Sequence, residues 1–441
     1  MTTTTDPRQG GLDLHDPELP ARLHRAFDAL REEDPVHPIG DGRWLLTRYD
    51  DVAAILKDRV RCGTDIHAVR GYDETRPFGA GSDLERVQEG LLINLPDAEH
   101  RRVRGAFTAP FTRHAVEAQV TAMVEALVDE LFAALPDDGE VDWVAAVARP
   151  LPARVFQGLF GMPEDDLERL IGLLHEDTVA IDVLLSPDLV APEDLARAQA
   201  AFLELRADLD RLARERHPRA AEGGDLLSFL LVQHDAGRLT WDDVLTQAME
   251  ALAAGTSTTM TLLSGTVEAF VTHPEQWDRV RADPALVRPA VEEALRWVSP
   301  ALSMGRVALV DFELHGREIR AGDVLQCGVL PANRDPRVFA DPHAFDVGRG
   351  ATPRPDGGKG APGQAGAGHV AFGGGTHVCL GAHVARLEAR LVLERLRERY
   401  ARITMEPGAA ALHPTLLIRT YRSLPVRLHA ADRTTTTGVA A

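Results

Sequence analysis

Apolar residues recur at intervals of three and four over most of the chain, which predicts a mainly helical protein. The longest such segment, Thr240–His273, begins with a threonine that can cap a helix and ends before Pro274. About thirty residues at roughly 1.5 Å each predict a rod about 45–50 Å long, enough to cross the middle of a domain. Its centre, Ala251–Thr259, consists of small residues, so we expect it to be buried with another group packed closely against Gly255. Further helices are predicted over residues 16–33, 50–57, 97–107, 114–135, 141–159, from 162 onward, and over 192–216, 274–282, 286–298 and 380–400.

Short β-branched and apolar runs predict a small β region beside the helices. The runs at 36–39 and 44–47 form a hairpin across Gly40–Gly42, and further strands are expected over 306–309, 312–314, 318–319 and 324–329. Residues 61–90 are rich in glycine and charge with little periodicity, which predicts a long irregular functional loop. Residues 350–368 are almost entirely Gly, Pro and Ala, which predicts a flexible insertion. No linker separates two cores, so we expect one domain over 15–428, between a disordered start (1–14) and a disordered tail (429–441).

Composition narrows the possible functions. A net charge of −19 disfavours nucleic-acid binding, which needs a basic face. The three cysteines, Cys62, Cys327 and Cys379, are too few and too scattered for a disulfide framework or a zinc site. No apolar run is long enough to cross a bilayer, and the Thr-rich start lacks the regions of a signal peptide. We therefore expect a soluble cytoplasmic protein without membrane association.

The strongest chemical motif is the Gly-rich segment Phe372–Gly381, in which Cys379 directly precedes an amphipathic helix. A thiolate at that place gains from the helix dipole and from free backbone N–H groups. The glycines allow the backbone to pass close to a flat ligand, and a thiolate on haem iron favours O–O cleavage. For a cysteine taken alone, the alternative is a buried structural residue beside a turn.

The whole string resembles the ligand loop of the cytochrome P450 family, Phe-Gly-x-Gly-x-His-x-Cys-x-Gly, at every fixed position. Other segments resemble signatures of the soluble bacterial members and follow in the family's order over residues 15 to 428; they are 254–259, Glu293–Arg296, His100–Arg104, 331–336 and 422–425. The resemblance implies the triangular cytochrome P450 fold, mainly α with a small β region and a long central helix over the haem. It also implies haem b (iron protoporphyrin IX) as cofactor, with Cys379 as the metal ligand.

Further site residues follow from the resemblance. It implies a clamp for the haem propionates, and haem contacts in the Cys loop and the central helix; these cofactor-binding residues are His100, Arg104, Arg306, His377, Gly255, Phe372, Gly373 and Gly381. It also implies a buried structural pair, Glu293 and Arg296, although spacing alone suits an ordinary helix-surface pair. The family's usual third partner, an arginine, is Ala344 here, and either Arg349 or His343 can replace it.

Three residues of the central helix are predicted to be catalytic. The family uses a threonine at Thr258 to deliver protons during oxygen activation, whereas a bare helix would favour a bond back to the preceding turn. An acid normally precedes it, but the residue here is Ser257, which puts the usual acid-assisted relay in doubt. Glu250 shares a face with Ala254 and Thr258, so it either binds a substrate group or feeds protons, or it turns aside to an arginine. The pocket is predicted to include Ala254, Leu302, Met304 and Leu417.

The resemblance implies a monooxygenase that inserts one atom of O₂ into a small organic substrate. We see no fused reductase region, so we expect the electrons to come from a ferredoxin and its ferredoxin reductase. We also expect the protein to be a monomer. Five arginines either form a basic docking patch for the electron donor or are merely dispersed surface charges. They are Arg101, Arg102, Arg113, Arg386 and Arg390. Two alternatives remain: a haem-thiolate enzyme with another outcome (peroxygenation, desaturation or oxidative coupling), and a haem sensor without turnover.

Overall fold

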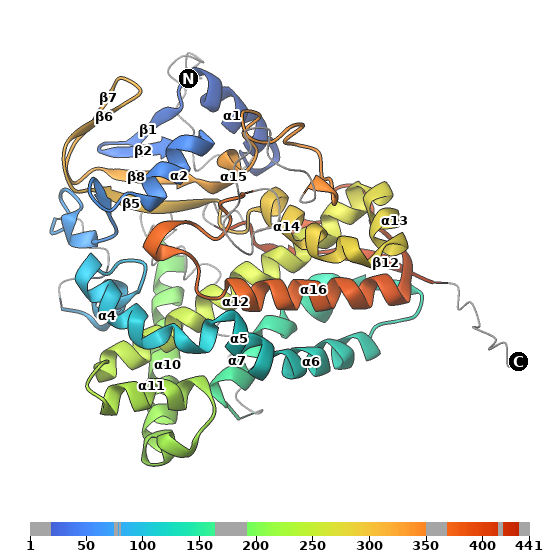
Figure 1. Ribbon diagram of the computed structural model, residues 1–441, viewed down its shortest axis with the longest axis horizontal. Coiled ribbons are helices and arrows are strands. Elements are labelled where there is room, and N and C mark those ends of the chain that lie inside the picture. Colours follow the sequence, from blue (N-terminus) through green and yellow to red (C-terminus); the bar gives the residue numbers. More distant parts are fainter. Residues whose placement is uncertain are drawn as a thin grey trace, which may run out of the picture.

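The computed structural model describes residues 19–74, 78, 81–163, 192–349, 368–412 and 418–431. Helix α12 (Trp241–Thr272) runs through the interior and packs against helices on several sides (Figure 1). Its start is a capping box, because Thr240 accepts from the Asp243 amide while Asp243 accepts from the Thr240 amide. The helix ends before Pro274, and the prediction over Thr240–His273 is confirmed.

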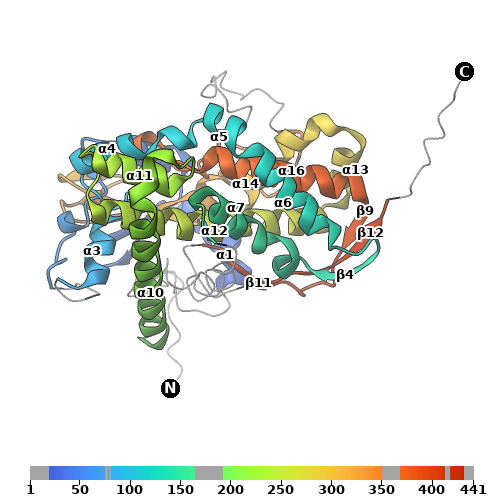
Figure 2. The same ribbon diagram turned by 90° about the horizontal axis from the view of Figure 1, so that it is seen from below.

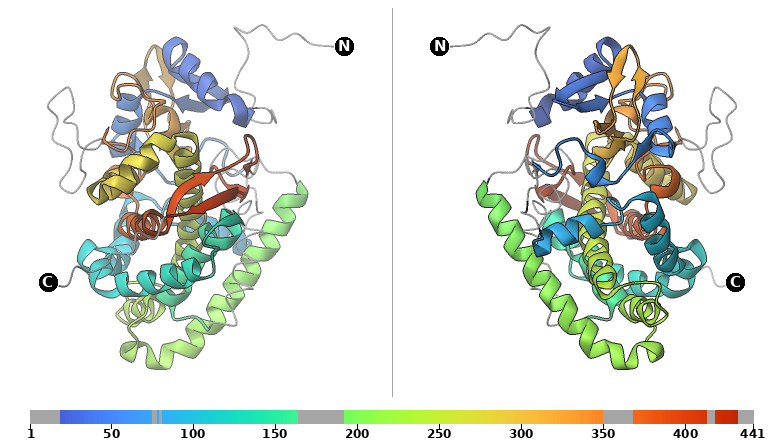
Figure 3. Two further views of the ribbon diagram at one scale, coloured as in Figure 1. Left: turned by 90° about the vertical axis from the view of Figure 1, so that its right-hand side faces the viewer. Right: turned by 90° about the vertical axis from the view of Figure 1, so that its left-hand side faces the viewer.

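Several of the other helices pack around α12, whereas α1, α2 and α15 lie beside the main sheet (Figures 1 and 2). Helices α7, α10, α14 and α16 contact α12 directly, and α6 packs on both α7 and α16. Helix α10 runs along one edge of the molecule (Figure 3). The bounds are α1 Leu19–Glu33, α2 Tyr49–Lys57, α3 Asp83–Gly90, α4 Asp97–Phe107, α5 Arg113–Gln119, α6 Thr121–Ala133, α7 Pro150–Phe160, α10 Pro192–Arg216, α11 Leu226–Asp235, α13 Pro274–Ala282, α14 Val287–Val298, α15 Val329–Ala332 and α16 Ala382–Arg399.

The main sheet of the β region lies at the N-terminal side of the molecule, whereas β12 lies near the C-terminal end (Figure 1). Among the described residues, its main sheet has the strand order β1-β2-β8-β5-β3, in which β2 and β8 are parallel and the other neighbours antiparallel. Smaller sheets join β4-β12-β9, β6-β7 and β10-β11. The bounds are β1 Val36–Gly40, β2 Arg43–Leu46, β3 Cys62–Gly63, β4 Gly139–Asp142, β5 Ser303–Ala308, β6 Phe312–Leu314, β7 Arg317–Ile319, β8 Val324–Gly328, β9 Tyr400–Thr404, β10 Ala411–Leu412, β11 Tyr421–Ser423 and β12 Pro425–Ala430.

The structure differs from the sequence predictions in several places. The stretch 61–90 is not irregular throughout, because it ends in α3, where Ser82 accepts from the Glu85 amide at the helix start. The predicted helix 114–135 is two helices, and the predicted helix 141–159 begins as strand β4 and continues as a π-helical turn before α7. Strand β12 reaches Ala430, two residues beyond the expected limit of the domain.

Other predictions cannot be compared with the structure. The start 1–14, the tail from 432, most of the insertion 350–368, the helix expected after Met162 and the pocket residue Leu417 lie outside the described residues.

The core supports a single-domain fold. The largest group of buried apolar residues surrounds α12, with contributions from α4, α6, α7, α14 and α16. A second group lies between the main sheet and α2. Within the described part of the chain, no helix combines the length and the apolarity that crossing a membrane requires.

Candidate active site

The Cys loop, Phe372–Gly381, connects the β region to α16. Gly373 and Gly375 have positive φ values of 73° and 66°, a backbone conformation that favours glycine. A Cβ on Gly375 would lie 2.9 Å from the carbonyl oxygen of Leu56, at the end of α2. The Cys379 amide donates to the Phe372 carbonyl at 2.9 Å, which closes the loop on itself. The glycines therefore allow a compact turn that presents the thiol.

The Cys379 thiol lies at the start of α16. It is solvent-accessible although protein surrounds it closely, and this burial raises the pKa of the thiol. The backbone amides of Gly381 and Ala382 donate to the sulfur, and they lower the pKa, as do the nearby cations Arg104 and Arg386. By contrast, burial raises the pKa of both Cys62 and Cys327 to about 12. Cys379 is therefore the cysteine with donors and cations in place for a thiolate.

Four basic side chains predicted to form the propionate clamp come from two elements, α4 and β5, and from the Cys loop. The rings of His100 (α4) and His377 lie 3.8 Å apart, centroid to centroid. Arg104, one turn after His100, donates to the Val378 carbonyl at 2.6 Å. Arg306 (β5) is buried and donates to the carbonyls of Gly305 and Leu56 at 2.8 and 3.4 Å. The structure thus brings the residues of the predicted clamp to the side of the Cys loop.

The clamp fits a cofactor that carries two carboxylates. Both ring nitrogens of His100 are buried without a hydrogen-bond partner, and burial lowers its pKa to about 4. Burial and then the neighbouring His100 lower the pKa of His377 to about 3. Among the described residues, neither Arg104 nor Arg306 has a carboxylate partner. Buried donors and cations of this kind need anions, and the two propionates of haem b supply them.

On α12, the Thr258 side chain is tied to the helix itself. The Thr258 hydroxyl donates to the Ala254 carbonyl at 2.6 Å, the local bond expected of a helical threonine. Thr258 and Ala254 are half-buried, whereas Ser257 is buried. Thr258 thus holds its proton toward its own helix, and its oxygen keeps acceptor capacity for a second donor. The role of Thr258 and Ser257 in proton delivery stays a prediction.

Glu250 has a partner that the sequence did not suggest. Its carboxylate accepts the Leu92 backbone amide at 2.6 Å, and the Ile93 amide also donates to it. Burial raises its pKa to about 7 against the opposing effect of these two amides. No arginine partner is found within the described residues. The structure therefore shows a contact with the segment before α4 in place of the arginine contact, while a role of Glu250 toward substrate or in proton supply stays a prediction.

The remaining predicted contacts fall in different places. A Cβ on Gly255 would lie 2.0 Å from the Phe156 ring of α7, so this ring provides the close packing expected there, while a haem contact of Gly255 stays a prediction. Met304 lies against the Cys loop, since its sulfur would be 3.0 Å from a Cβ on Gly373. Leu302 is 4% exposed and belongs to a buried group with α1. The place of Leu302 on the wall of the substrate pocket stays a prediction.

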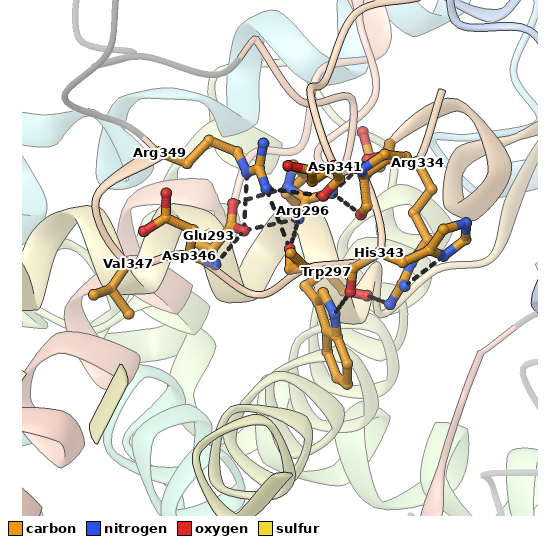
Figure 4. Close-up of polar contacts among 12 residues, drawn as sticks. Glu293, Arg296, Trp297, Arg334, Asp341, His343, Asp346, Val347 and Arg349 are labelled. Atoms are coloured by element: carbon orange, nitrogen blue, oxygen red, sulfur yellow. Dashed lines mark hydrogen bonds and ion pairs between the residues drawn. The ribbon is translucent and has the colours of Figure 1, made fainter. Parts of the chain in front are cut away.

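The Glu293–Arg296 pair is fully buried, and Figure 4 shows its partners. Arg296 donates to both Glu293 oxygens at 2.8 and 2.7 Å and to the carbonyls of Asn333, Pro342 and Ala344. Arg349 is the third partner, with its Nε 3.0 Å from Glu293 (Figure 4). His343 instead contacts Asp28 at 2.8 Å. The pair is therefore a buried structural lock, and the helix-surface alternative is wrong.

A second network around Glu292 was missed from the sequence. Arg386 (α16) donates to both Glu292 oxygens at 2.6 and 2.9 Å, and His369 lies 3.1 Å from one of them. Together these partners outweigh burial and lower the pKa of Glu292 to about 2. The Arg386 guanidinium also lies 4.5 Å over the ring of Phe372, a cation–π contact. One side chain thus connects α14, the Cys loop and α16.

Glu388, also on α16, is a second group that the sequence analysis missed. It is fully buried, and neither carboxylate oxygen has a partner among the described residues. Burial raises the pKa of Glu388 well above its ordinary value, so the folded protein holds this proton to a higher pH than a free carboxyl group does. Its position among the apolar residues of the helix is the signal that could have identified it.

The five arginines considered as a docking patch all have acidic partners. Arg101 pairs with Asp97 on α4, and Arg102 with Glu99 and Asp243. The others pair within or between α5, α14 and α16, as Arg113–Glu117, Arg386–Glu292 and Arg390–Glu394. The positive charge of these five arginines is therefore largely neutralised by carboxylates of the same protein.

Haem that is held through a sulfur ligand needs a thiolate and, beside it, a clamp for its two carboxylates. The fold and the site thus define a haem-thiolate oxygenase. The chain belongs to the cytochrome P450 family, whose model matches residues 72–409. When bound, the haem activates O₂ so that one oxygen atom is inserted into the substrate, and the thiolate assists O–O cleavage.

Similarity to known members extends over nearly the whole chain. The protein is 33% identical over 437 residues to cytochrome P450 monooxygenase PikC of Streptomyces venezuelae, covering 96% of this chain and 95% of that protein. It is 32% identical to 6-deoxyerythronolide B hydroxylase of Saccharopolyspora erythraea, covering 94% and 98%. The crystal structure of CalO2 superposes with a TM-score of 0.81 at 26% identity, covering 95% and 99%. The protein is thus a haem monooxygenase that uses O₂, a small substrate and a redox partner.

Proposed function

We propose that the protein is a cytoplasmic, monomeric, ferredoxin-dependent monooxygenase that hydroxylates a largely apolar organic compound in specialised metabolism. The observation that carries the proposal is the Cys379 thiol, with the Gly381 and Ala382 amides on its sulfur and the cationic clamp beside it. PikC, a monooxygenase, and 6-deoxyerythronolide B hydroxylase support the reaction type. Thr258, on the face of α12 shared with Ala254, is the residue assigned to proton delivery.

Electron supply is part of the same proposal. PikC and 6-deoxyerythronolide B hydroxylase align with this chain over 95% and 98% of their own length, which supports an oxygenase of the bacterial class. The resemblance to bacterial members suggests a separate ferredoxin with its reductase as the electron donor. Because the docking arginines are already paired, recognition of the ferredoxin depends on short-range fit rather than on a strong positive field.

A second candidate is favoured by Ser257, which stands where the family usually has an acid. Without that acid, peroxide, which already carries the protons and electrons, is a reasonable alternative oxidant. Oxygen consumption with ferredoxin, reductase and a reduced nicotinamide supports the main proposal. Oxidation of a test compound with peroxide alone, and none with the ferredoxin system, supports the second candidate.

The test of the site itself is a spectrum. The reduced protein with carbon monoxide should give the strongly red-shifted Soret band of thiolate ligation, and Cys379→His should lose that band. Cys62→Ala, a buried cysteine without donors for a thiolate, is the matched control and should keep it. A band at the imidazole-type position in the wild type would contradict thiolate ligation through Cys379.

A further inference from the structure

The segment Gly90–Leu95 joins α3 to α4, and α12 holds its backbone at two points. The Gln247 side chain donates to the Gly90 carbonyl at 3.0 Å. One turn later, Glu250 accepts the Leu92 amide at 2.6 Å. The segment also approaches α12 closely, because a Cβ on Gly90 would lie 3.3 Å from Thr246. Side chains of one helix thus fix a carbonyl and an amide of the same short segment.

The far end of the segment is fixed from the β region. The Thr64 hydroxyl donates to the Leu95 carbonyl at 2.9 Å and lies 3.4 Å from the Nε2 of His377. Between the fixed points, Ile93 is 42% exposed although it is apolar. Helix α4, with its clamp residues, begins two residues after Leu95. The segment therefore links α12 to the helix that carries the clamp residues His100 and Arg104.

Glu250 is the charged member of this set. Its carboxylate receives two backbone amides, those of Leu92 and Ile93, and both bonds are stronger when the group is ionised. Other charged groups near this part of α12 have partners elsewhere within the described residues: Glu85 with the Gly81 amide, Glu89 with His67, Arg102 with Glu99 and Asp243, and Arg206 with Asp242. The two amides are thus the groups on which the charge of Glu250 acts.

We propose that Glu250 is a positioning residue that holds the segment Gly90–Leu95 over the substrate pocket through the Leu92 and Ile93 amides. The ionised carboxylate keeps the segment closed, and protonation loosens it, so that access to the pocket increases as the pH falls through neutrality. The direction agrees with burial, which raises the pKa of Glu250 to about 7. The inference rests on the proposed function, because it assigns a movable wall to that pocket.

Hydrogen exchange of the 88–95 peptide tests the proposal without any substrate. In the haem-loaded protein at pH 8, Glu250→Leu should lower the protection factors of the Leu92 and Ile93 amides about tenfold or more, the loss expected for a charge-assisted bond. Wild-type protection, corrected for intrinsic rates, should be higher at pH 8 than at pH 6. Glu250→Gln retains an acceptor but not the charge, so it should give intermediate protection without the pH dependence.

Two further measurements separate this role from a general loss of structure. Glu89→Gln removes a neighbouring carboxylate that does not contact these amides, and it should leave their protection unchanged. Rebinding of carbon monoxide after photolysis should be faster in Glu250→Leu than in wild type, while the position of the Soret band stays the same. Equal protection in wild type, Glu250→Leu and Glu250→Gln would overturn the proposal. An imidazole-type Soret band in wild type would instead overturn the proposed function and leave the exchange result standing.

Discussion

Replacing Arg349 by methionine tests whether this residue completes the buried lock around Glu293. Arg349 contributes one ion pair, from its Nε to Glu293 at 3.0 Å. It also donates to the carbonyls of Ala340, Asp341 and Ala344 with the rest of its guanidinium. Its side chain is largely buried, and methionine keeps most of its apolar contacts.

The expected cost follows from what remains after the substitution. A hydrogen bond to a charged group is worth about 1.5–3 kcal/mol, and half-exposed carbonyls can bond to water instead. Glu293 keeps both bonds to Arg296, so the loss stays below the roughly 3–5 kcal/mol of an uncompensated buried charge. We therefore expect Arg349→Met to lower the free energy of unfolding by about 2–3 kcal/mol.

The assay is urea unfolding of the haem-loaded protein, followed by tryptophan fluorescence and analysed by linear extrapolation. His343→Ala is the matched control, because His343 forms a half-exposed pair with Asp28 that should contribute about 0–1 kcal/mol. A loss of unfolding free energy below about 0.5 kcal/mol for Arg349→Met would refute the assignment of Arg349 as the third partner. A loss for His343→Ala that is larger than the loss for Arg349→Met would refute it as well.

Two other substitutions give predictions of opposite sign. Because burial raises the pKa of Glu388 above its ordinary 4.5, the folded state holds this proton longer than the unfolded chain, and stability falls as the pH rises above that value. Glu388→Gln cannot ionise, so its urea-unfolding free energy should exceed that of wild type at pH 8 and match it near pH 4.5; equal values at both pH would contradict the burial argument. Gly255→Ala should cost about 1–3 kcal/mol, because the new Cβ meets the Phe156 ring at 2.0 Å. Gly105→Ala, where nothing lies within 4 Å, should stabilise by about 0.4–1 kcal/mol, and a similar gain at Gly255 would show that α7 does not pack there.

The parts of the fold that could be predicted carry their signals locally. Helix α12 has continuous periodicity, a capping threonine and a terminal proline, and its bounds agree within one residue at each end. Helix α3 has a similar signal in Ser82 and Glu85, but its apolar pattern is too short to stand out from the surrounding glycines. The sequence predicts a helix where strand β4 lies. The prediction is wrong because β4 depends on its pairing with β12, with Val141 opposite Val426, and this pairing joins segments far apart in the sequence.

The candidate site likewise contains residues that could be predicted from the sequence and residues that could not. The Cys loop and the clamp could be predicted because their residues match motifs of the family that the chain resembles, and the structure brings the clamp residues together beside the loop. The choice between Arg349 and His343 depends on the path of the backbone after Pro342, which no local pattern determines. For Glu250, periodicity gave the correct helix face but not the amides of Leu92 and Ile93 that meet it there.

The pairing of the five arginines near the Cys loop has a consequence for encounter kinetics. Each guanidinium already has a carboxylate within 3.3 Å, so opposite charges partly cancel at distances beyond a Debye length, about 8–10 Å in ordinary buffers. A negatively charged donor then approaches without strong attraction from these arginines and against the net charge of −19, so its association rate is expected no higher than the unsteered range of about 10⁵–10⁶ M⁻¹s⁻¹. Added salt should therefore not slow the encounter. A donor carboxylate that reaches one of these guanidiniums either shares it with the internal partner, as Glu99 and Asp243 share Arg102, or displaces that partner, so productive docking rearranges existing pairs rather than neutralising free charge.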